Sequence, residues 1–302
     1  MRSPWRVLGL FTLVAVTASA SSDSLAAGTR TYTSASGICM KVEGSATPAA
    51  TVALVDTQTA AGTTSDVVVS VQPHLAGAGL RGWMSSTLGN HGARKGVELV
   101  RFDPSNWNVI AAETLDPTYI QQIDLPALDA GSDNTPPWTV RLATTSSRTT
   151  PAQGTFTCGS PSERQKKWFS NAFRVQIDGL DMSRVAKAEP VIVRSSLLTR
   201  VQLLNAEAFR PRGTTAATST TTISNLVLTT ATSGNTLPGL QQWLAGGAAP
   251  RNGAIVYLAL NLTETLCTTR LTGLTIRKIT VDSATSQARV EMTVGGLQLT
   301  CP

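Results

Sequence analysis

A short pattern, Gly-Leu-x-x-Trp followed by an apolar residue, occurs once in each half of this 302-residue chain, at residues 79–84 and 239–244. In both halves it follows an apolar run and a Pro-containing turn, and it precedes a basic turn and a second apolar run. A repeat of this kind decides how the whole chain is divided. The pattern therefore predicts two copies of one β-rich unit, the alternative being two unrelated β domains that share common pieces by chance.

The same order of elements continues on both sides of this pattern. Each half opens on a strand of alternating apolar and polar residues that stops at an acid-Gly turn, at residues 40–44 and 175–179. Each half closes on two strands around a polar turn that contains Asp. Between them, residues 159–167 are polar and contain Pro. We predict a first domain over residues 21–158, a linker over 159–170 and a second domain over 171–302.

The Gly-Leu-x-x-Trp segment of the second half has the features of a short helix. Leu240, Trp243 and Leu244 lie at i, i+3 and i+4, which places them on one helix face. Pro238 suits the first turn, and Gly246 suits the end. The predicted fold is mainly β, with two tandem β-barrel or β-sandwich domains that each carry one short helix with a buried stripe.

The first 20 residues have the three parts of a secretory signal peptide. Residues 1–6 are basic, residues 7–16 are apolar, and Ala18-Ser19-Ala20 is an A-x-A cleavage site. The apolar run is too short to span a bilayer as a stable helix, and no later run is long enough. We expect cleavage after Ala20, a secreted or periplasmic protein, and no membrane span.

The four cysteines are expected to form disulfides, because an exported chain meets an oxidising compartment and their spacings do not fit a zinc site. Four cysteines allow three connectivities. The division into halves favours Cys39 with Cys158 and Cys267 with Cys301, since each pair then lies within one half. The alternative is four free, buried thiols.

The charge pattern argues against a nucleic-acid surface. Loss of Arg2 and Arg6 with the signal peptide lowers the formal charge from +6 to +4. The densest cluster, Arg164, Lys166 and Lys167, has no interleaved aromatic residues. We interpret it as part of a solvated linker, with a polyanion patch as the alternative.

The residues that usually carry catalysis are scarce. His74 and His91 are the only histidines, and the sequence contains no nucleophile elbow, zinc-protease motif, Walker loop or dinucleotide fingerprint. We expect both histidines to be surface or capping residues, and Asp178 and Asp181 to form a turn rather than a carboxylate pair. The sequence thus predicts no enzyme activity, cofactor or metal.

The order of strand, long excursion, strand, helix, strand and hairpin resembles the contractile-phage tail tube proteins. The second half carries the likeness best, in Phe-Arg-Val-Gln-Ile-Asp-Gly-Leu-Asp at residues 173–181 and in Asn-Leu-Val-Leu at 225–228 before the helix. Residues 279–283 leading into 290–292 resemble the closing hairpin of that family, as do residues 128–130 leading into 140–142 in the first half.

This resemblance implies a small β-barrel-like domain with a helix on its side, six of which form a ring in that family, with rings stacked into a tube. The tube subunit of type VI secretion systems is similar. Three copies of a chain with two such domains then make a pseudo-hexameric ring, with other tube or envelope proteins as further partners. The expected function is an exported, self-assembling structural subunit.

The competing interpretation is a secreted β-rich module that binds carbohydrate or protein through its loops. Trp107, Trp138 and Trp243 are its candidate aromatic anchors. The helix pattern assigns Trp243 to the core. Trp107 lies in a Pro-Ser-Asn-Trp-Asn loop, and the alternative for it is a ring folded back on its own domain.

Overall fold

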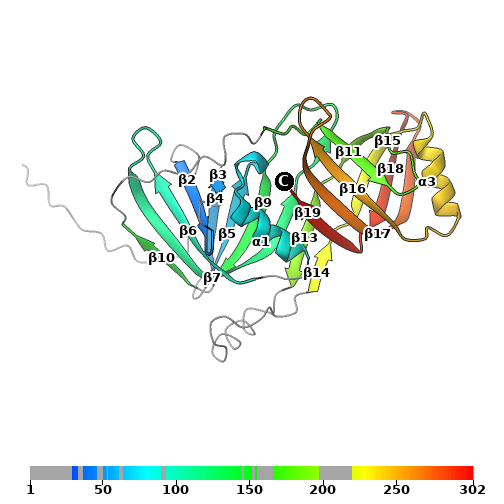
Figure 1. Ribbon diagram of the computed structural model, residues 1–302. Coiled ribbons are helices and arrows are strands. Elements are labelled where there is room, and N and C mark those ends of the chain that lie inside the picture. Colours follow the sequence, from blue (N-terminus) through cyan, green and yellow to red (C-terminus); the bar gives the residue numbers. More distant parts are fainter. Residues whose placement is uncertain are drawn as a thin grey trace, which may run out of the picture.

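The part of the chain that the structure describes folds into two antiparallel β-sheets with two short α-helices, and one sheet is nearly barrel-shaped (Figure 1). This mainly β architecture confirms the predicted fold class. The computed structural model describes residues 29–32, 37–45, 50–52, 54–60, 64–89, 93–144, 146–151, 154, 166–196 and 220–301.

The first sheet has eleven strands in the order β1-β4-β5-β9-β7-β6-β2-β3, with β10 and the β13–β14 hairpin also on β7. Its strands are β1 (Thr29–Tyr32), β2 (Gly37–Val42), β3 (Ala50–Val52), β4 (Leu54–Ala60), β5 (Thr64–Val71), β6 (Lys95–Phe102), β7 (Val109–Leu125), β9 (Trp138–Thr144), β10 (Ser147–Thr150), β13 (Val191–Ser196) and β14 (Thr220–Ile223). A 3-10 turn, η1 (Pro73–Leu75), and helix α1 (Ala78–Leu88) connect β5 to β6.

The second sheet has eight strands in the order β11-β16-β17-β18-β15-β12-β8, with β19 on β17. Its strands are β8 (Leu128–Asp129), β11 (Phe173–Ile177), β12 (Val185–Ala188), β15 (Leu226–Ala231), β16 (Arg251–Leu258), β17 (Thr265–Asp282), β18 (Gln287–Thr293) and β19 (Gly296–Thr300). Helix α3 (Thr236–Ala245) connects β15 to β16.

The predicted internal repeat is present in the strand pairing. In the first half the neighbours run β5-β9-β7-β6-β2, and in the second half β15-β18-β17-β16-β11. A helix follows β5 and β15, and β10 and β19 extend β7 and β17 in the same way. We call the two units the first and second repeat, and residues that occupy the same place in them equivalent.

Local irregularities repeat as well. The register shifts at Ile120/Gln122 between β7 and β9, and at Ile276/Lys278 between β17 and β18. A second shift separates Lys95 from Val97 against β7, and Arg251 from Gly253 against β17. Because a β-bulge is a specific one-residue insertion, shared bulges fix which residues are equivalent. Gln122 is therefore equivalent to Lys278.

Each helix is held by the same hydrogen bond. Trp83 Nε1 donates to the carbonyl oxygen of Ala93 at 2.7 Å, and Trp243 Nε1 donates to that of Ala249 at 2.8 Å. Both tryptophans are buried beside the loop that leads into the next strand. The pattern that predicted the helices thus has one physical role in both repeats, which is to fasten the helix to its following turn.

The acid-Gly turns give a paired stability prediction. Gly44 and Gly179 have φ of 79° and 71°, where a β-carbon is strained, so Gly44→Ala and Gly179→Ala should each lower the free energy of unfolding by about 1–2 kcal/mol. Gly82 lies inside α1 with open space around it, so Gly82→Ala should raise the free energy of unfolding by up to about 1 kcal/mol. Denaturant titrations followed by tryptophan fluorescence would show opposite signs.

Two strands pair across the predicted boundary between the halves. β13 comes from the second half of the sequence and pairs with β7 of the first. β8 comes from the first half and pairs with β12 of the second. Most buried hydrophobic side chains of both repeats accordingly belong to one continuous core cluster, and a smaller separate cluster lies in the first repeat. Of the predicted linker, residues 159–165 lie outside the described residues, whereas Lys166 and Lys167 are exposed and Trp168 is buried.

The predicted bridge between Cys267 and Cys301 is present and fastens the end of β19 to β17. Cys39 is also disulfide-bonded. Its predicted partner, Cys158, lies outside the described residues, so that pairing stays a prediction.

Candidate functional site

The joint between the two repeats begins with a shared strand edge. Residues 122–124 of β7 pair with β9 on one side and with β13 on the other. The Arg194 Nε group donates to Gln122 Oε1 at 3.0 Å across this edge. Strand pairing of this kind satisfies backbone groups that a free edge leaves exposed. The second repeat thus completes the sheet of the first.

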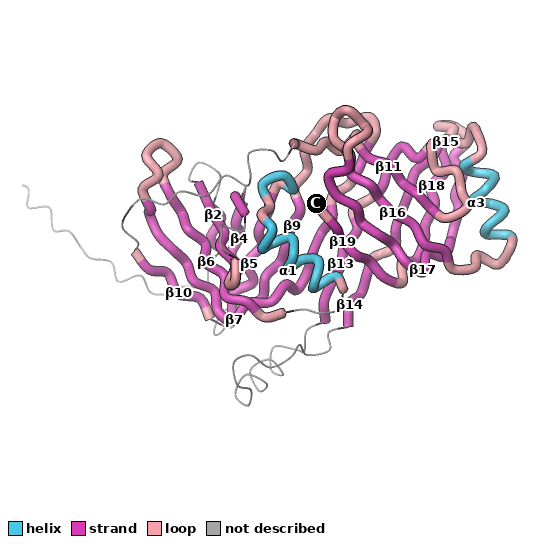
Figure 2. Tube along the Cα trace, in the orientation of Figure 1, coloured by secondary structure: helices cyan, strands magenta, loops and turns pink. Residues whose placement is uncertain are grey.

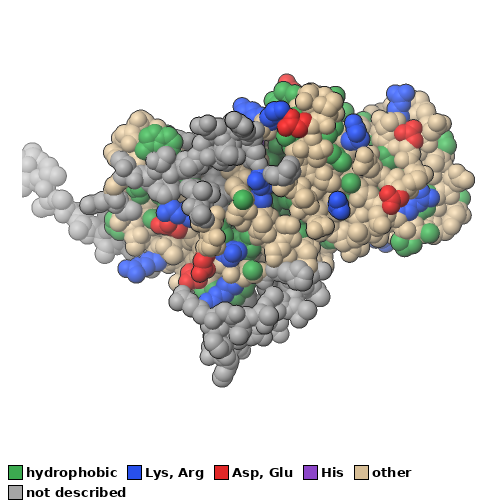
Figure 3. Space-filling model, in the orientation of Figure 1, with side chains coloured by type: hydrophobic (Ala, Val, Ile, Leu, Met, Phe, Trp, Pro, Cys, Tyr) green, Lys and Arg blue, Asp and Glu red, His purple; other side chains and the backbone are tan. Residues whose placement is uncertain are grey.

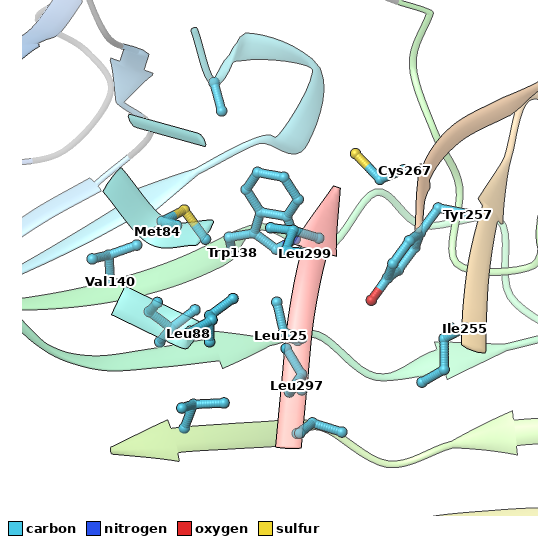
Figure 4. Close-up of a cluster of buried hydrophobic side chains, with 14 of the residues drawn as sticks. Met84, Leu88, Leu125, Trp138, Val140, Ile255, Tyr257, Cys267, Leu297 and Leu299 are labelled. Atoms are coloured by element: carbon cyan, nitrogen blue, oxygen red, sulfur yellow. The ribbon is translucent and has the colours of Figure 1, made fainter. Parts of the chain in front are cut away.

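The joint is also an apolar contact between α1 and β19. Figure 4 shows Met84, Leu88 and Leu125 of the first repeat beside Leu297 and Leu299 of the second. All five are buried. Ser85 Oγ donates to the carbonyl oxygen of Leu299 at 2.9 Å. Burial of each such side chain stabilises the joint by about 1.5–3 kcal/mol, so the repeats are expected to hold together as one body.

The second repeat carries the same surface without a partner. Residues 278–280, equivalent to 122–124, pair with β18, and no described strand covers their other side. We call residues 278–281 the open edge. Leu244 on α3 is 38% exposed although its equivalent, Met84, is fully buried. Val281 is 49% exposed although its equivalent, Leu125, is 1% exposed.

α3 and β18 lie at one end of the molecule, away from the joint (Figure 2), and the open edge pairs with β18. α1, in contrast, lies at the joint itself, beside β19. The apolar positions that the first repeat buries against the second are therefore displayed at the far end by the second repeat.

The opposite end of the molecule, which belongs to the first repeat, is more polar. Ser147 and Thr149 on β10 are the equivalents of Leu297 and Leu299, and both are exposed. Here β1 pairs with the outer edge of β4, so this edge is covered by the chain's own N-terminal strand. The two ends of the molecule thus differ in both chemistry and edge pairing.

A pocket of about 180 Å³ opens at the joint. It is lined by Pro73, His74 and Trp138 from the first repeat and by Lys166, Trp168, Tyr257, Glu264, Thr265, Leu266 and Cys267. The indole N–H groups of Trp138 and Trp168 are buried and have no hydrogen-bond partner among the described residues. Buried donors of this kind are normally satisfied by protein, water or ligand.

Burial sets the electrostatics of this pocket. The ring of Trp168 meets Tyr257 edge-on at 5.2 Å, and burial raises the pKa of Tyr257 to about 12. Burial, with a smaller contribution from Lys167, lowers the pKa of His74. Lys166 forms an ion pair with Glu264, and both are about half exposed. A neutral guest with hydrogen-bond acceptors would suit such a lining.

The other residues singled out in the sequence have structural surroundings. The ring of Trp107 stacks on that of Phe102 at a centroid distance of 5.1 Å, and the residue as a whole is 43% exposed. Trp243 is buried in the core, with the Arg251 guanidinium 5.1 Å from its ring centroid. His91 lies outside the described residues.

The two aspartates of the second acid-Gly turn are not placed as a catalytic pair. The backbone carbonyl of Asp178 accepts a hydrogen bond from Arg251 at 2.6 Å, and the Asp181 carboxylate accepts one from the Ser183 amide at 2.9 Å. Hydrogen bonds from the Ser183 amide and hydroxyl lower the pKa of Asp181. Both residues thus belong to turns, as the sequence predicted.

Sequence reasoning found Trp138 but missed Trp168, because Trp168 directly follows the polar run that was interpreted as a linker. A single tryptophan at the end of a polar segment was the available signal.

Within the described residues no three His, Cys, Asp or Glu side chains are grouped as metal ligands. No helix in that same part of the chain is both long and apolar enough to cross a membrane. On the face shown in Figure 3, Lys and Arg side chains are scattered among acidic and polar ones. No protein-family model and no curated protein matches this sequence.

Proposed function

We propose that this chain is an exported structural subunit that assembles head to tail with further copies into a ring or tube. One observation carries the proposal: the first repeat binds the second through an edge strand and an apolar helix face, and the second repeat displays the equivalent edge and face unused. A heterologous contact of this type closes into a ring when its rotation allows.

Three chains would supply six repeats, which is the ring number that the tail tube resemblance suggests. Contacts within and between chains would then alternate around the ring. The disulfide between Cys267 and Cys301 fits an oxidising compartment, as an exported subunit requires.

Assembly is testable on the chain that begins at Ser21. We expect light scattering to give a mass that rises with concentration toward three copies, and negative-stain microscopy to show rings or short tubes. A protein that stays monomeric at high micromolar concentration would contradict the proposal.

Intact-mass measurement of the secreted protein checks the cleavage after Ala20.

The pocket at the joint favours a second candidate function, a module that binds a small neutral sugar. Its lining combines aromatic rings with the two unsatisfied indole donors of Trp138 and Trp168. Methyl β-glucoside should then quench tryptophan fluorescence saturably, and Trp168→Phe should weaken this binding while keeping an aromatic ring. Absence of saturable quenching with the parent chain counts against this function.

A further inference from the structure

Exposed apolar side chains gather on two equivalent loops. Of the large hydrophobic residues that are exposed in the described part of the chain, Leu244 and Val281 belong to the contact proposed above. The others lie in the loops that join β6 to β7 and β16 to β17, or at the start of β7: Trp107, Ile110, Leu260 and Leu262. Clusters of this kind mark contact sites. We call residues 103–108 the first tip and residues 259–264 the second tip.

The two tips are built alike. Each connects two strands that pair with each other. In each, the first amide donates to the last carbonyl oxygen at 2.9 Å, from Asp103 to Asn108 and from Ala259 to Glu264. Both loops project from the same side of the molecule, at the top of Figure 1. One flat surface can therefore contact both tips of a single chain.

An exposed apolar residue of each tip has a left-handed backbone. Trp107 has a φ of 61°, and Leu262 has a φ of 56°. Glycine and asparagine adopt this conformation more readily than bulky residues do. Asn106 and Asn261 each lie directly before one of these positions, so the chain carries the more tolerant residue one place away. An apolar side chain kept at a strained position supports a role for that side chain in function.

The backbone of both tips is largely hydrogen-bonded within the loop. In the first tip the amides of residues 103, 105, 107 and 108 donate to acceptors inside the tip, and Pro104 has no amide hydrogen. In the second tip the amides of residues 259 and 262–264 do the same. An unsatisfied backbone group is costly in hydrocarbon, where water is absent. These loops can therefore bring their apolar side chains into lipid with most of their amides already bonded.

The charges at the tips favour neither sign. The Asp103 carboxylate accepts hydrogen bonds from Ser105, which lower its pKa, and Glu264 pairs with Lys166. Apolar contact, rather than attraction to a charged surface, is therefore the force that the tips supply. Tryptophan is enriched where a membrane meets water, because its ring is apolar and its N–H group stays hydrated.

We propose that the two tips dock this chain on a phospholipid surface, with Trp107 and Leu262 inserted among the upper parts of the acyl chains. The inference is independent of head-to-tail assembly, because one chain carries both tips. A ring of several chains would carry several pairs of tips, and many linked contacts on one surface bind more tightly than one.

Vesicle co-sedimentation of the chain from Ser21 tests this docking. The parent chain should bind phosphatidylcholine vesicles, and binding should persist in concentrated NaCl, since salt screens charge attraction but not apolar insertion. Trp107→Asn and Leu262→Asn should each weaken binding at least about tenfold. Asparagine suits the left-handed backbone, so both variants should fold. Leu244→Asn is the matched control and should bind like the parent, because it alters an exposed leucine outside the tips.

A brominated lipid locates the tryptophan ring. The other tryptophans after residue 20 are buried, namely Trp83, Trp138, Trp168 and Trp243. Quenching of fluorescence by phosphatidylcholine with brominated acyl chains therefore reports on Trp107. Trp107→Phe keeps an apolar ring, so it should still bind vesicles while losing this quenching.

The outcomes separate lipid docking from assembly, which light scattering measures without vesicles. Failure of the parent chain to bind vesicles, or binding that salt abolishes, would overturn the docking and leave assembly standing. Reduced self-association of Trp107→Asn without vesicle binding by the parent would overturn it too, and would assign the tips to a contact between copies. Vesicle binding by a parent chain that stays monomeric would support the docking and contradict the proposed function.

Discussion

The Met84→Ala chain is expected to unfold with about 2–5 kcal/mol less free energy than the parent chain, whereas Leu244→Ala should cost about 1 kcal/mol or less. The two residues are equivalent in the repeat, but Met84 is fully buried beside β19 and Leu244 is 38% exposed. Truncation of Met84 leaves a cavity in the joint, while truncation of Leu244 leaves a surface. Denaturant unfolding of both variants under one condition measures the difference.

Assembly should depend on the side chain of Leu244, independently of the stability of the first repeat. Leu244→Lys places a charge on the face that docks another copy, so it should raise the concentration needed for assembly at least about tenfold while leaving unfolding nearly unchanged. Leu260→Lys is the matched control, because this leucine is 65% exposed and precedes the start of β17, whereas the open edge lies near the end of that strand. Parent-like assembly by Leu244→Lys would argue that α3 takes no part in the contact.

The helix stripe shows how far local pattern reaches. Leu240 and Trp243 are buried as their spacing predicts, but Leu244 on the same predicted face is exposed. In the first repeat the equivalent Met84 is buried by the repeat that follows it. Helical period identifies a residue that suits burial, and only the presence of a neighbour decides whether that residue is buried.

The closing hairpins were predicted alike and differ. β17 and β18 form a hairpin through a short turn, as expected. Between β7 and β9, however, the chain inserts β8, which pairs with β12 of the second repeat. β7 and β9 still pair antiparallel as the predicted hairpin, but the segment that joins them contains this additional strand. The cause is a long-range pairing of only two residues, which leaves no periodic signal in the sequence.

The pocket was also beyond sequence reasoning, because its walls come from both repeats. Trp138 ends up across from Tyr257 and Trp168 only because β13 crosses to β7 and closes the joint. Composition marked residues 159–170 as a linker, but Trp168 at 2% exposure fills space beside Tyr257. Local polarity thus predicts the exposure of Lys166 and Lys167 correctly. It does not predict the burial of Trp168, because Tyr257 comes from a distant strand.

Removal of the bridge between Cys267 and Cys301 is the second large effect we expect. The two cysteines are 34 residues apart, and the loop-entropy model gives a loss of about 4 kcal/mol for a loop of this length. This is a large share of the roughly 5–15 kcal/mol that stabilises a typical domain. Cys267→Ala with Cys301→Ala should therefore lower the unfolding midpoint strongly in denaturant.

The bridge also supports the joint, so its role is not limited to closing the loop between the two cysteines. It ties the end of β19 to β17, and β19 carries Leu297 and Leu299 against α1. When the end of β19 is free to fray, the contact with Met84 should weaken, so combining Met84→Ala with loss of the bridge should cost less than the sum of the two separate effects. Strict additivity in this double-mutant cycle would show that β19 is held by strand pairing alone and that the bridge does not reach the joint.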